Sequence, residues 1–194
     1  MIRLPVPKLE GEISVEEALF RRRSKRVYKK SPLTLEELAQ LLWAAYGITH
    51  PRGFKTTPSA GATYPLVVYV AVGEVEGLEP GVYRYIPETH SLKLIKREDV
   101  REKLYIACLR QRWVLEAPVD LVLAANFERT TRVYGKRGIR YVWMEFGHAS
   151  QNVYLQATAL GLGTVAVAAF YDYLIKEALG IKEDPGYVMP VGRV

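Results

Sequence analysis

The chain has 194 residues, of which 49% are hydrophobic and 25% are charged. This composition is typical of folded globular domains and excludes collagen-like and intrinsically disordered chains. A chain of this length can bury about 70% of its surface around one hydrophobic core. No repeat, linker or low-complexity tract divides it, so we expect a single domain over residues 1–194.

The cysteine count and the N-terminal residues bear on the compartment. Cys108 is the only cysteine, which excludes an intramolecular disulfide and is typical of a reducing environment. Residues 1–8 lack the apolar core of a signal peptide, so we expect a cytoplasmic location. Polar side chains such as His148 and Gln151 interrupt the longest uncharged stretch, residues 146–171, and argue against a membrane span.

The positive charge of the chain is concentrated in one place. The sequence carries 27 basic and 21 acidic residues, a net charge of +6. Seven of the basic residues fall within residues 21–30, a window without an acid that we call the basic segment. The remainder of the chain is nearly neutral, so the charge indicates one local site rather than a basic surface.

Two capping boxes predict the first helices. Ser14, followed three residues later by a glutamate, opens a short helix that runs into the basic segment. Thr34 begins the same pattern, and leucines at helical spacing follow until Gly47 ends the helix. Small and helix-breaking residues make residues 51–65 a loop.

Apolar runs in the middle of the chain predict strands. Residues 66–72 are continuously apolar and β-branched, a pattern typical of a strand buried on both faces. Residues 81–85 and 91–95 alternate and predict a hairpin, and residues 119–125 predict a further core strand. A helix is expected over residues 100–109.

The C-terminal part is predicted to contain a long helix over residues 141–160, closed by Gly161. A strand over residues 164–169, a short helix over 174–179 and an extended end over 187–194 follow. Helices and strands alternate without regular βαβ order, which predicts a mixed sheet flanked by helices.

Motifs for metal, phosphate-loop or nucleophilic chemistry are absent. The three histidines and Cys108 lack the spacing of metal ligands, so we expect no metal. Gly161 and Gly163 follow a helix and precede a strand, the reverse of a dinucleotide-binding turn. Termination of the long helix explains them instead.

The basic segment is the first candidate site. Arg22, Ser24 and Arg26 alternate, so in an extended chain their side chains point to one side. Two guanidinium groups and a hydroxyl together suit a phosphate dianion. A solvated charged face and a nucleic-acid contact are the alternatives, although no nucleic-acid reader motif accompanies the segment.

Three weaker candidate motifs accompany the basic segment. Residues 58–65 (Pro-Ser-Ala-Gly-Ala-Thr-Tyr-Pro) would let a flat ligand approach the backbone, although an ordinary surface loop has the same composition. The small apolar side chains of residues 165–169 leave room for a planar group, or form a tight core. Arg193 is a second basic candidate, or else a surface residue near the end of the sequence.

Together these motifs resemble the FMN-dependent nitroreductase superfamily, and within it the short branch similar to azoline-oxidising dehydrogenases. The resemblance covers residues 14–193 and is carried by Arg22-Arg-Ser-Lys-Arg26, Pro58–Pro65, Gly81-Val-Tyr83, Ala117-Pro118 and Ala159–Gly163. It implies an α+β fold, with a mixed, mainly antiparallel central sheet flanked by helices, in an intertwined homodimer. It also implies FMN at the subunit interface, and no membrane or nucleic-acid partner.

The resemblance assigns roles to individual residues. Arg22, Ser24 and Arg26 would hold the phosphate, ribityl chain and pyrimidine edge of FMN, and Arg193 would close on the phosphate. The loop would reach the flavin from the partner subunit, and residues 168 and 169 would line the ring. The full set implied for the cofactor is Arg22, Arg23, Ser24, Arg26, Ser59, Ala60, Gly61, Ala168, Ala169 and Arg193.

The implied activity is hydride transfer from NADH or NADPH, through the flavin, to a small electron-poor acceptor such as a nitroaromatic or quinone, in ping-pong order. No protein nucleophile is needed, and Arg26 would stabilise the anionic reduced flavin electrostatically. One alternative is a dehydrogenase that oxidises an azoline-type peptide heterocycle. A second is a non-catalytic protein that binds nucleic acid or another anion through the basic segment.

The sequence departs from the superfamily at two places. Ala62 stands where many classical nitroreductases carry asparagine. The lysine–tyrosine pair of the azoline dehydrogenases is not matched by Tyr134, Lys136 or Arg137.

Overall fold

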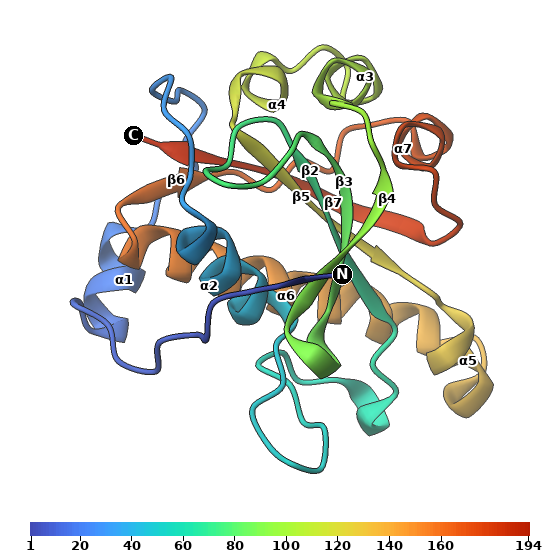
Figure 1. The fold of residues 1–194 in the computed structure, drawn as a ribbon. Coiled ribbons are helices and arrows are strands. Elements are labelled where there is room, and N and C mark those ends of the chain that lie inside the picture. Colours follow the sequence, from blue (N-terminus) through green and yellow to red (C-terminus); the bar gives the residue numbers. More distant parts are fainter.

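The computed structural model describes all 194 residues and contains one seven-stranded sheet with helices on both faces (Figure 1). The spatial order of the strands is β1-β4-β3-β2-β5-β7-β6, and every strand pair is antiparallel. The strands are β1 Ile2–Arg3, β2 Leu66–Val72, β3 Gly81–Ile86, β4 Ser91–Lys96, β5 Val119–Ala125, β6 Leu162–Thr164 and β7 Asp184–Arg193. The helices are α1 Val15–Arg21, α2 Leu35–Tyr46, α3 Arg101–Ala107, α4 Arg112–Glu116, α5 Glu128–Tyr134, α6 Arg137–Ala159 and α7 Asp172–Leu179.

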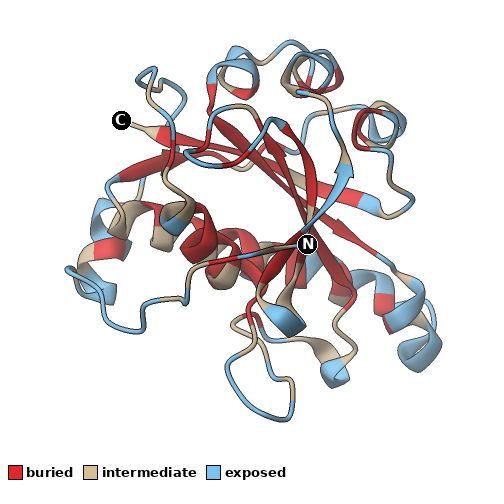
Figure 2. Cartoon of the chain, in the orientation of Figure 1, coloured by how far each residue is buried: buried red, intermediate tan, exposed pale blue.

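The two faces of the sheet bury separate hydrophobic clusters. Helices α2 and α6 cover one face, and α3, α4 and α7 cover the other (Figure 1). Every residue of β2 and β5 is therefore buried, and the central strands are red throughout in Figure 2. Along β2, Val68 and Val70 belong to the α2–α6 cluster, whereas Val67 and Tyr69 belong to the opposite one. This alternation is the period-two pattern of a strand between two layers.

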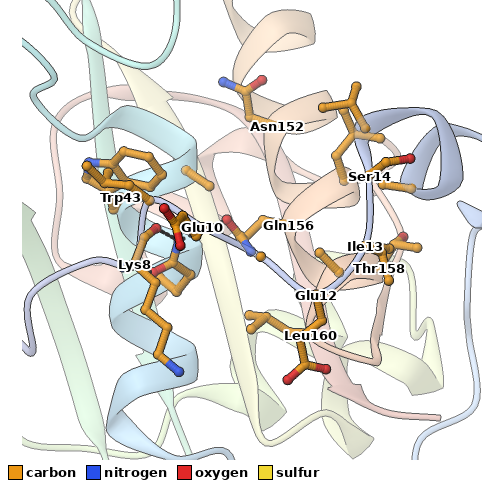
Figure 3. Close-up of a pocket in the computed structure, with 18 of the residues that line it drawn as sticks. Lys8, Glu10, Glu12, Ile13, Ser14, Trp43, Asn152, Gln156, Thr158 and Leu160 are labelled. Atoms are coloured by element: carbon orange, nitrogen blue, oxygen red, sulfur yellow. Dashed lines mark hydrogen bonds between the residues drawn. The ribbon is translucent and has the colours of Figure 1, made fainter.

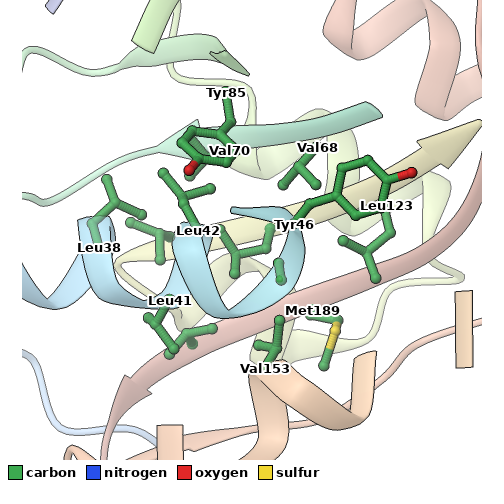
Figure 4. Packing of buried hydrophobic residues seen from close by; sticks show 14 of the residues in the cluster. Leu38, Leu41, Leu42, Tyr46, Val68, Val70, Tyr85, Leu123, Val153 and Met189 are labelled. Carbon is green, nitrogen blue, oxygen red and sulfur yellow. The ribbon is translucent and has the colours of Figure 1, made fainter. Parts of the chain in front are cut away.

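Helix α2 is anchored by its start and by its buried face. Thr34 caps it with a complete capping box, in which its hydroxyl accepts from the Glu37 N–H and the Glu37 carboxylate accepts from the Thr34 N–H. Leu38, Leu42 and Tyr46 point into the cluster beneath the sheet (Figure 4). Burial of each such leucine contributes roughly 2 kcal/mol.

The expected α+β fold is confirmed, with a sheet that is antiparallel throughout its strand pairs. The long helix starts at Arg137, four residues before the predicted start, and α4 and α5 were not predicted. None of the helices has both the length and the apolar character needed to cross a membrane.

The predicted strand over residues 164–169 is wrong after Thr164. Strand β6 ends there, and only an isolated bridge from Val167 to Val188 follows. The reason is local hydrogen bonding, because the Ala166 N–H donates to the Tyr154 hydroxyl (2.8 Å) instead of to a strand. Ala168 and Ala169 consequently lie in an exposed loop.

Candidate functional site

The basic segment lies along the outer edge of the sheet, beside β6. After α1 ends, Ser24 bridges to Thr164, and the Lys25 N–H donates to the Thr164 carbonyl (2.9 Å). Gly163 permits this close approach, since a Cβ there would lie 2.7 Å from the Cβ of Lys25. The Gly161–Gly163 motif therefore does more than terminate α6.

Tyr154 of α6 organises one half of this edge. Its hydroxyl lies 3.0 Å from the Ser24 hydroxyl and accepts from the Ala166 N–H. The Arg22 guanidinium lies over its ring, 5.2 Å from the centroid, in a cation–π contact. Sequence analysis missed Tyr154, because nothing in the helical pattern distinguishes it from a core aromatic.

Helix α4 organises the other half. The Arg26 guanidinium lies 5.5 Å from the centroid of a Trp113 ring, and the Trp113 indole N–H is buried without a partner. The Gln111 side chain donates to the Ala169 carbonyl (3.1 Å). Arg26 and the exposed Ala168–Ala169 loop are thus both held next to α4, which the sequence analysis did not foresee.

This edge has the donors that a phosphate group requires. Arg22 and Arg26 form no salt bridge, in contrast to Arg21, which pairs with Glu17. The Thr164 hydroxyl beside Ser24 is buried without a partner. Two unpaired guanidinium groups and unused hydroxyl capacity fit a bound anion and a hydroxylated chain.

Two of the predicted residues are engaged elsewhere. Arg193 donates to both oxygens of Glu37, at 2.9 and 3.0 Å, although its backbone carbonyl also accepts from the Lys29 N–H. Arg23 turns back and donates to the carbonyls of Phe20 and Arg22, at the end of α1. The structure therefore separates the Arg23 side chain from those of Arg22 and Arg26.

The loop with Ser59, Ala60 and Gly61 lies near the other end of α6. A Cβ at Gly61, where φ is +57°, would lie 2.4 Å from the Tyr134 hydroxyl oxygen. Burial raises the pKa of Glu145 in α6, and the hydroxyls of Ser59 and Tyr46 act in the opposite direction. Glu145 and Tyr154 are nine residues apart, which is about 13 Å along a helix. Within one chain, no hydrogen bond joins this loop to the basic segment.

A polar cluster missed by the sequence analysis lies under this loop. The buried Glu145 accepts from the Tyr46 hydroxyl (2.7 Å), which in turn accepts from the Leu66 N–H. The Lys55 ammonium lies 4.1 Å from the centroid of the Tyr46 ring. Burial lowers the pKa of Lys55, because desolvation disfavours its charge.

A cavity of about 790 Å³ lies between residues 8–15, α2 and the C-terminal half of α6 (Figure 3). Its lining mixes apolar side chains such as Trp43 with the amides of Gln40 and Gln156. Gln40 exchanges two hydrogen bonds with the Lys8 backbone, at 2.8 and 3.0 Å. None of the residues predicted to bind the cofactor lines this cavity.

The antiparallel sheet between two helical layers is the fold of the nitroreductase-like oxidoreductases, and its edge beside the long helix holds two guanidinium groups, Arg22 and Arg26, that form no salt bridge. The chain belongs to the nitroreductase family, whose model matches residues 19–193. It is 59% identical to a protein of Methanocaldococcus jannaschii whose name assigns it to the nitroreductases, over 99% of this chain and 96% of that one.

A solved structure and a second relative extend the comparison. A crystal structure of a nitroreductase homologue from Ralstonia eutropha has a TM-score of 0.87 and 31% identity, over 100% of this chain and 89% of that chain. The trifolitoxin-processing protein TfxB of Rhizobium leguminosarum is 32% identical over 113 residues. That match covers 56% of this chain and 30% of TfxB.

Proposed function

We propose that this chain is an FMN-dependent oxidoreductase that transfers hydride from NADH or NADPH to a small electron-poor acceptor, such as a nitroaromatic or a quinone. Family membership supports a flavin-dependent oxidoreductase. The choice of FMN rests on one observation. Arg22 and Arg26, on either side of Ser24, are two guanidinium groups that form no salt bridge. This donor set suits a cofactor that ends in a phosphate monoester.

Each residue has a proposed part in holding the cofactor. Arg22 and Ser24 bind the phosphate and ribityl chain, and Arg26 places positive charge beside the pyrimidine edge. Arg193 joins the phosphate by exchanging its Glu37 partner, whereas Arg23 remains at the end of α1. The Ala168–Ala169 loop offers backbone and small side chains to the ring. When bound, FMN supplies the hydride chemistry of both half-reactions.

The proposed active unit is a homodimer. Within one chain, the loop over residues 59–61 adjoins Glu145 of α6, whereas the basic segment contacts Tyr154, about 13 Å further along the helix. In a dimer, this loop of one subunit would meet the basic segment of the other. Its backbone N–H groups would then face the flavin, consistent with its small side chains.

The visible absorption spectrum of the purified protein tests the proposal. A yellow protein that releases stoichiometric FMN is expected. Arg22→Gln should weaken FMN binding by about tenfold, because it removes a charge-assisted hydrogen bond. Arg23→Gln is the matched control and should retain FMN. A colourless protein that takes up no added FMN would overturn the proposal and favour the non-catalytic alternative.

The direction of electron transfer distinguishes the proposed reductase from the remaining alternative, a dehydrogenase. The alternative, a dehydrogenase that oxidises an azoline-type peptide heterocycle, draws on the similarity to the trifolitoxin-processing protein, which covers 56% of this chain. Such an enzyme would be bleached anaerobically by its organic substrate and not by a nicotinamide. We expect bleaching by NADH or NADPH, followed by recovery of the colour on addition of a quinone.

A further inference from the structure

A second cavity, of about 520 Å³, opens between the loop after α2 and the start of α5. Residues 48–55 supply one wall and residues 62–64 another, with Glu88 and Arg129 at the rim. No residue of the basic segment lines it. The cavity therefore shares no residue with the Arg22–Arg26 edge, although Ala62 joins it to the loop over residues 59–61.

Three cations and a single carboxylate line this cavity. Arg52, Lys55 and Arg129 line it, and none of them forms a salt bridge. The Arg129 side chain donates only to the Tyr64 carbonyl (3.0 Å). The one carboxylate in the lining, Glu88, is exposed and unpaired. The net charge of the lining is therefore positive.

The position of the Lys55 ammonium is the strongest evidence that this cavity binds an anion. This ammonium is held between two aromatic rings, 4.1 Å from the centroid of Tyr46 and 5.2 Å from that of Tyr64. These contacts compensate only in part for lost hydration. Burial and Arg129 lower the pKa of this half-buried ammonium, whereas Glu88 and Glu145 raise it, and an anion in the adjoining hollow would stabilise its charge further.

The cavity wall also contains an unusual backbone. Ala62 and Tyr64 have φ of +52° and +45°, a left-handed conformation that side chains other than glycine rarely adopt. On the opposite wall, the Arg52 guanidinium lies 4.8 Å from the centroid of the Phe54 ring. The cavity thus combines cations with a flat aromatic surface, as a phosphate attached to an aromatic group requires.

We infer that this cavity binds a phosphate monoester carried by a reactant, with Arg52, Lys55 and Arg129 as its cationic ligands. Two sources share this chemistry, namely the 2′-phosphate that distinguishes NADPH from NADH, and a phosphate on the acceptor. The choice of these two sources rests on the proposed function, whereas the anion site rests only on the residues that line the cavity.

Calorimetric titration of the purified full-length protein tests the site. Adenosine 2′-monophosphate should bind at least about tenfold more tightly than adenosine, and phenyl phosphate more tightly than phenol, because the phosphate adds charge-assisted contacts. Lys55→Met and Arg52→Met should abolish this preference while the thermal midpoint stays unchanged. Arg132→Met is the matched control, since Arg132 lies on the same helix as Arg129 and pairs with Glu128 outside the cavity.

Glu88→Gln gives an independent measurement that no folding defect can imitate. It removes the only carboxylate of the lining, so phosphate monoesters should bind more tightly to it than to the wild type. Equal affinity for each monoester and its parent alcohol in the wild type would overturn the site. A preference that survives Lys55→Met and Arg52→Met would overturn it too.

Steady-state kinetics then distinguish the two sources. If the donor carries the phosphate, Lys55→Met lowers kcat/KM for NADPH and leaves that for NADH unchanged. If the acceptor carries it, the NADPH:NADH ratio is unaffected although the phosphate preference in binding is lost. The flavin content of the same samples distinguishes failure of the cavity site from failure of the proposed function. A yellow protein without phosphate preference contradicts the cavity site alone, and a colourless one contradicts the proposed function.

Discussion

Asp120 is the most exceptional single residue in the molecule. It lies on β5, fully buried, and neither carboxylate oxygen has a hydrogen-bond partner. Burial raises its pKa well above the ordinary value of 3.8, so the folded protein holds it protonated over a range in which the unfolded chain releases the proton. Between these two pKa values, each unit of rising pH costs about 1.4 kcal/mol of stability.

Asp120→Asn should therefore flatten the pH dependence of stability. The amide cannot ionise, so its free energy of unfolding should fall less than that of the wild type as the pH rises from 5 to 8. At pH 8, we expect the variant to be the more stable protein. Urea unfolding at several pH values measures this, and parallel profiles for the two proteins would contradict it.

Tyr154 allows a test of the cofactor edge at a single atom. Tyr154→Phe removes the hydroxyl that positions Ser24 and the Ala166 N–H, and it leaves the ring under Arg22. Loss of about 1 kcal/mol of hydrogen bonding should weaken FMN binding roughly fivefold. Tyr141→Phe, on the same helix and without a hydroxyl partner, is the control for fluorescence titrations with FMN. Equal affinities would remove Tyr154 from the edge.

For single residues, the sequence predicts which side chains donate hydrogen bonds better than it predicts which residues those side chains contact. The alternation of Arg22, Ser24 and Arg26 is a property of the local chain, and within it Ser24 forms an extended bridge to Thr164. The contacts with Tyr154 and Trp113 depend on how α6 and α4 pack, which no local pattern encodes. The roles of all these residues toward a cofactor remain predictions.

Among the elements, α2 connects the helical layer to the end of the sheet. Glu37 completes its capping box and also accepts both hydrogen bonds from Arg193 at the end of β7. Thr34→Ala should cost about 1 kcal/mol, because it leaves a helix N–H without its cap. For a chain of this length, the thermal midpoint should fall by about 2–4 °C.

Ser14→Ala is the matched comparison for this prediction. Ser14 caps α1, which has seven residues and buries only Ala18. Its loss should move the midpoint less than the loss of Thr34, since α1 contributes little to the core. Differential scanning calorimetry of the two variants decides the order, and a larger effect of Ser14→Ala would contradict it.

Element prediction succeeded where one pattern dominated and failed where tertiary contacts decided. Local sequence patterns alone predict three elements. Continuous apolar runs predict β2 and β5, and a capping box with spaced leucines predicts α2. The run after Thr164 has the composition of a strand, yet the Tyr154 hydroxyl takes one of its N–H groups. The short α4 and α5, with five and seven residues, span too few turns for an apolar helical period to be recognised in the sequence.

On the scale of the whole molecule, the sheet is covered on both faces, but α6 is not covered on its outer side. Ile139, Trp143 and Met144 are 46%, 51% and 52% exposed there. An apolar patch of neighbouring side chains on the longest helix is typical of an interface between protein chains. It lies on the half of α6 that adjoins the loop over residues 59–61, where the proposed homodimer needs a contact.

Met144→Glu should therefore separate the subunits. A carboxylate in an apolar interface loses hydration without gaining a partner, and this cost can exceed several kcal/mol. Light scattering of the wild type should give twice the mass of the 22.0 kDa chain, and that of the variant the mass of one chain. FMN should be lost together with the dimer, because each proposed site needs residues from both subunits. Tyr173→Glu, at a more exposed position on α7, should leave mass and colour unchanged. A monomeric variant that retains FMN would show that one chain suffices to hold the cofactor, and the proposed contribution of residues 59–61 from the partner subunit would then be wrong.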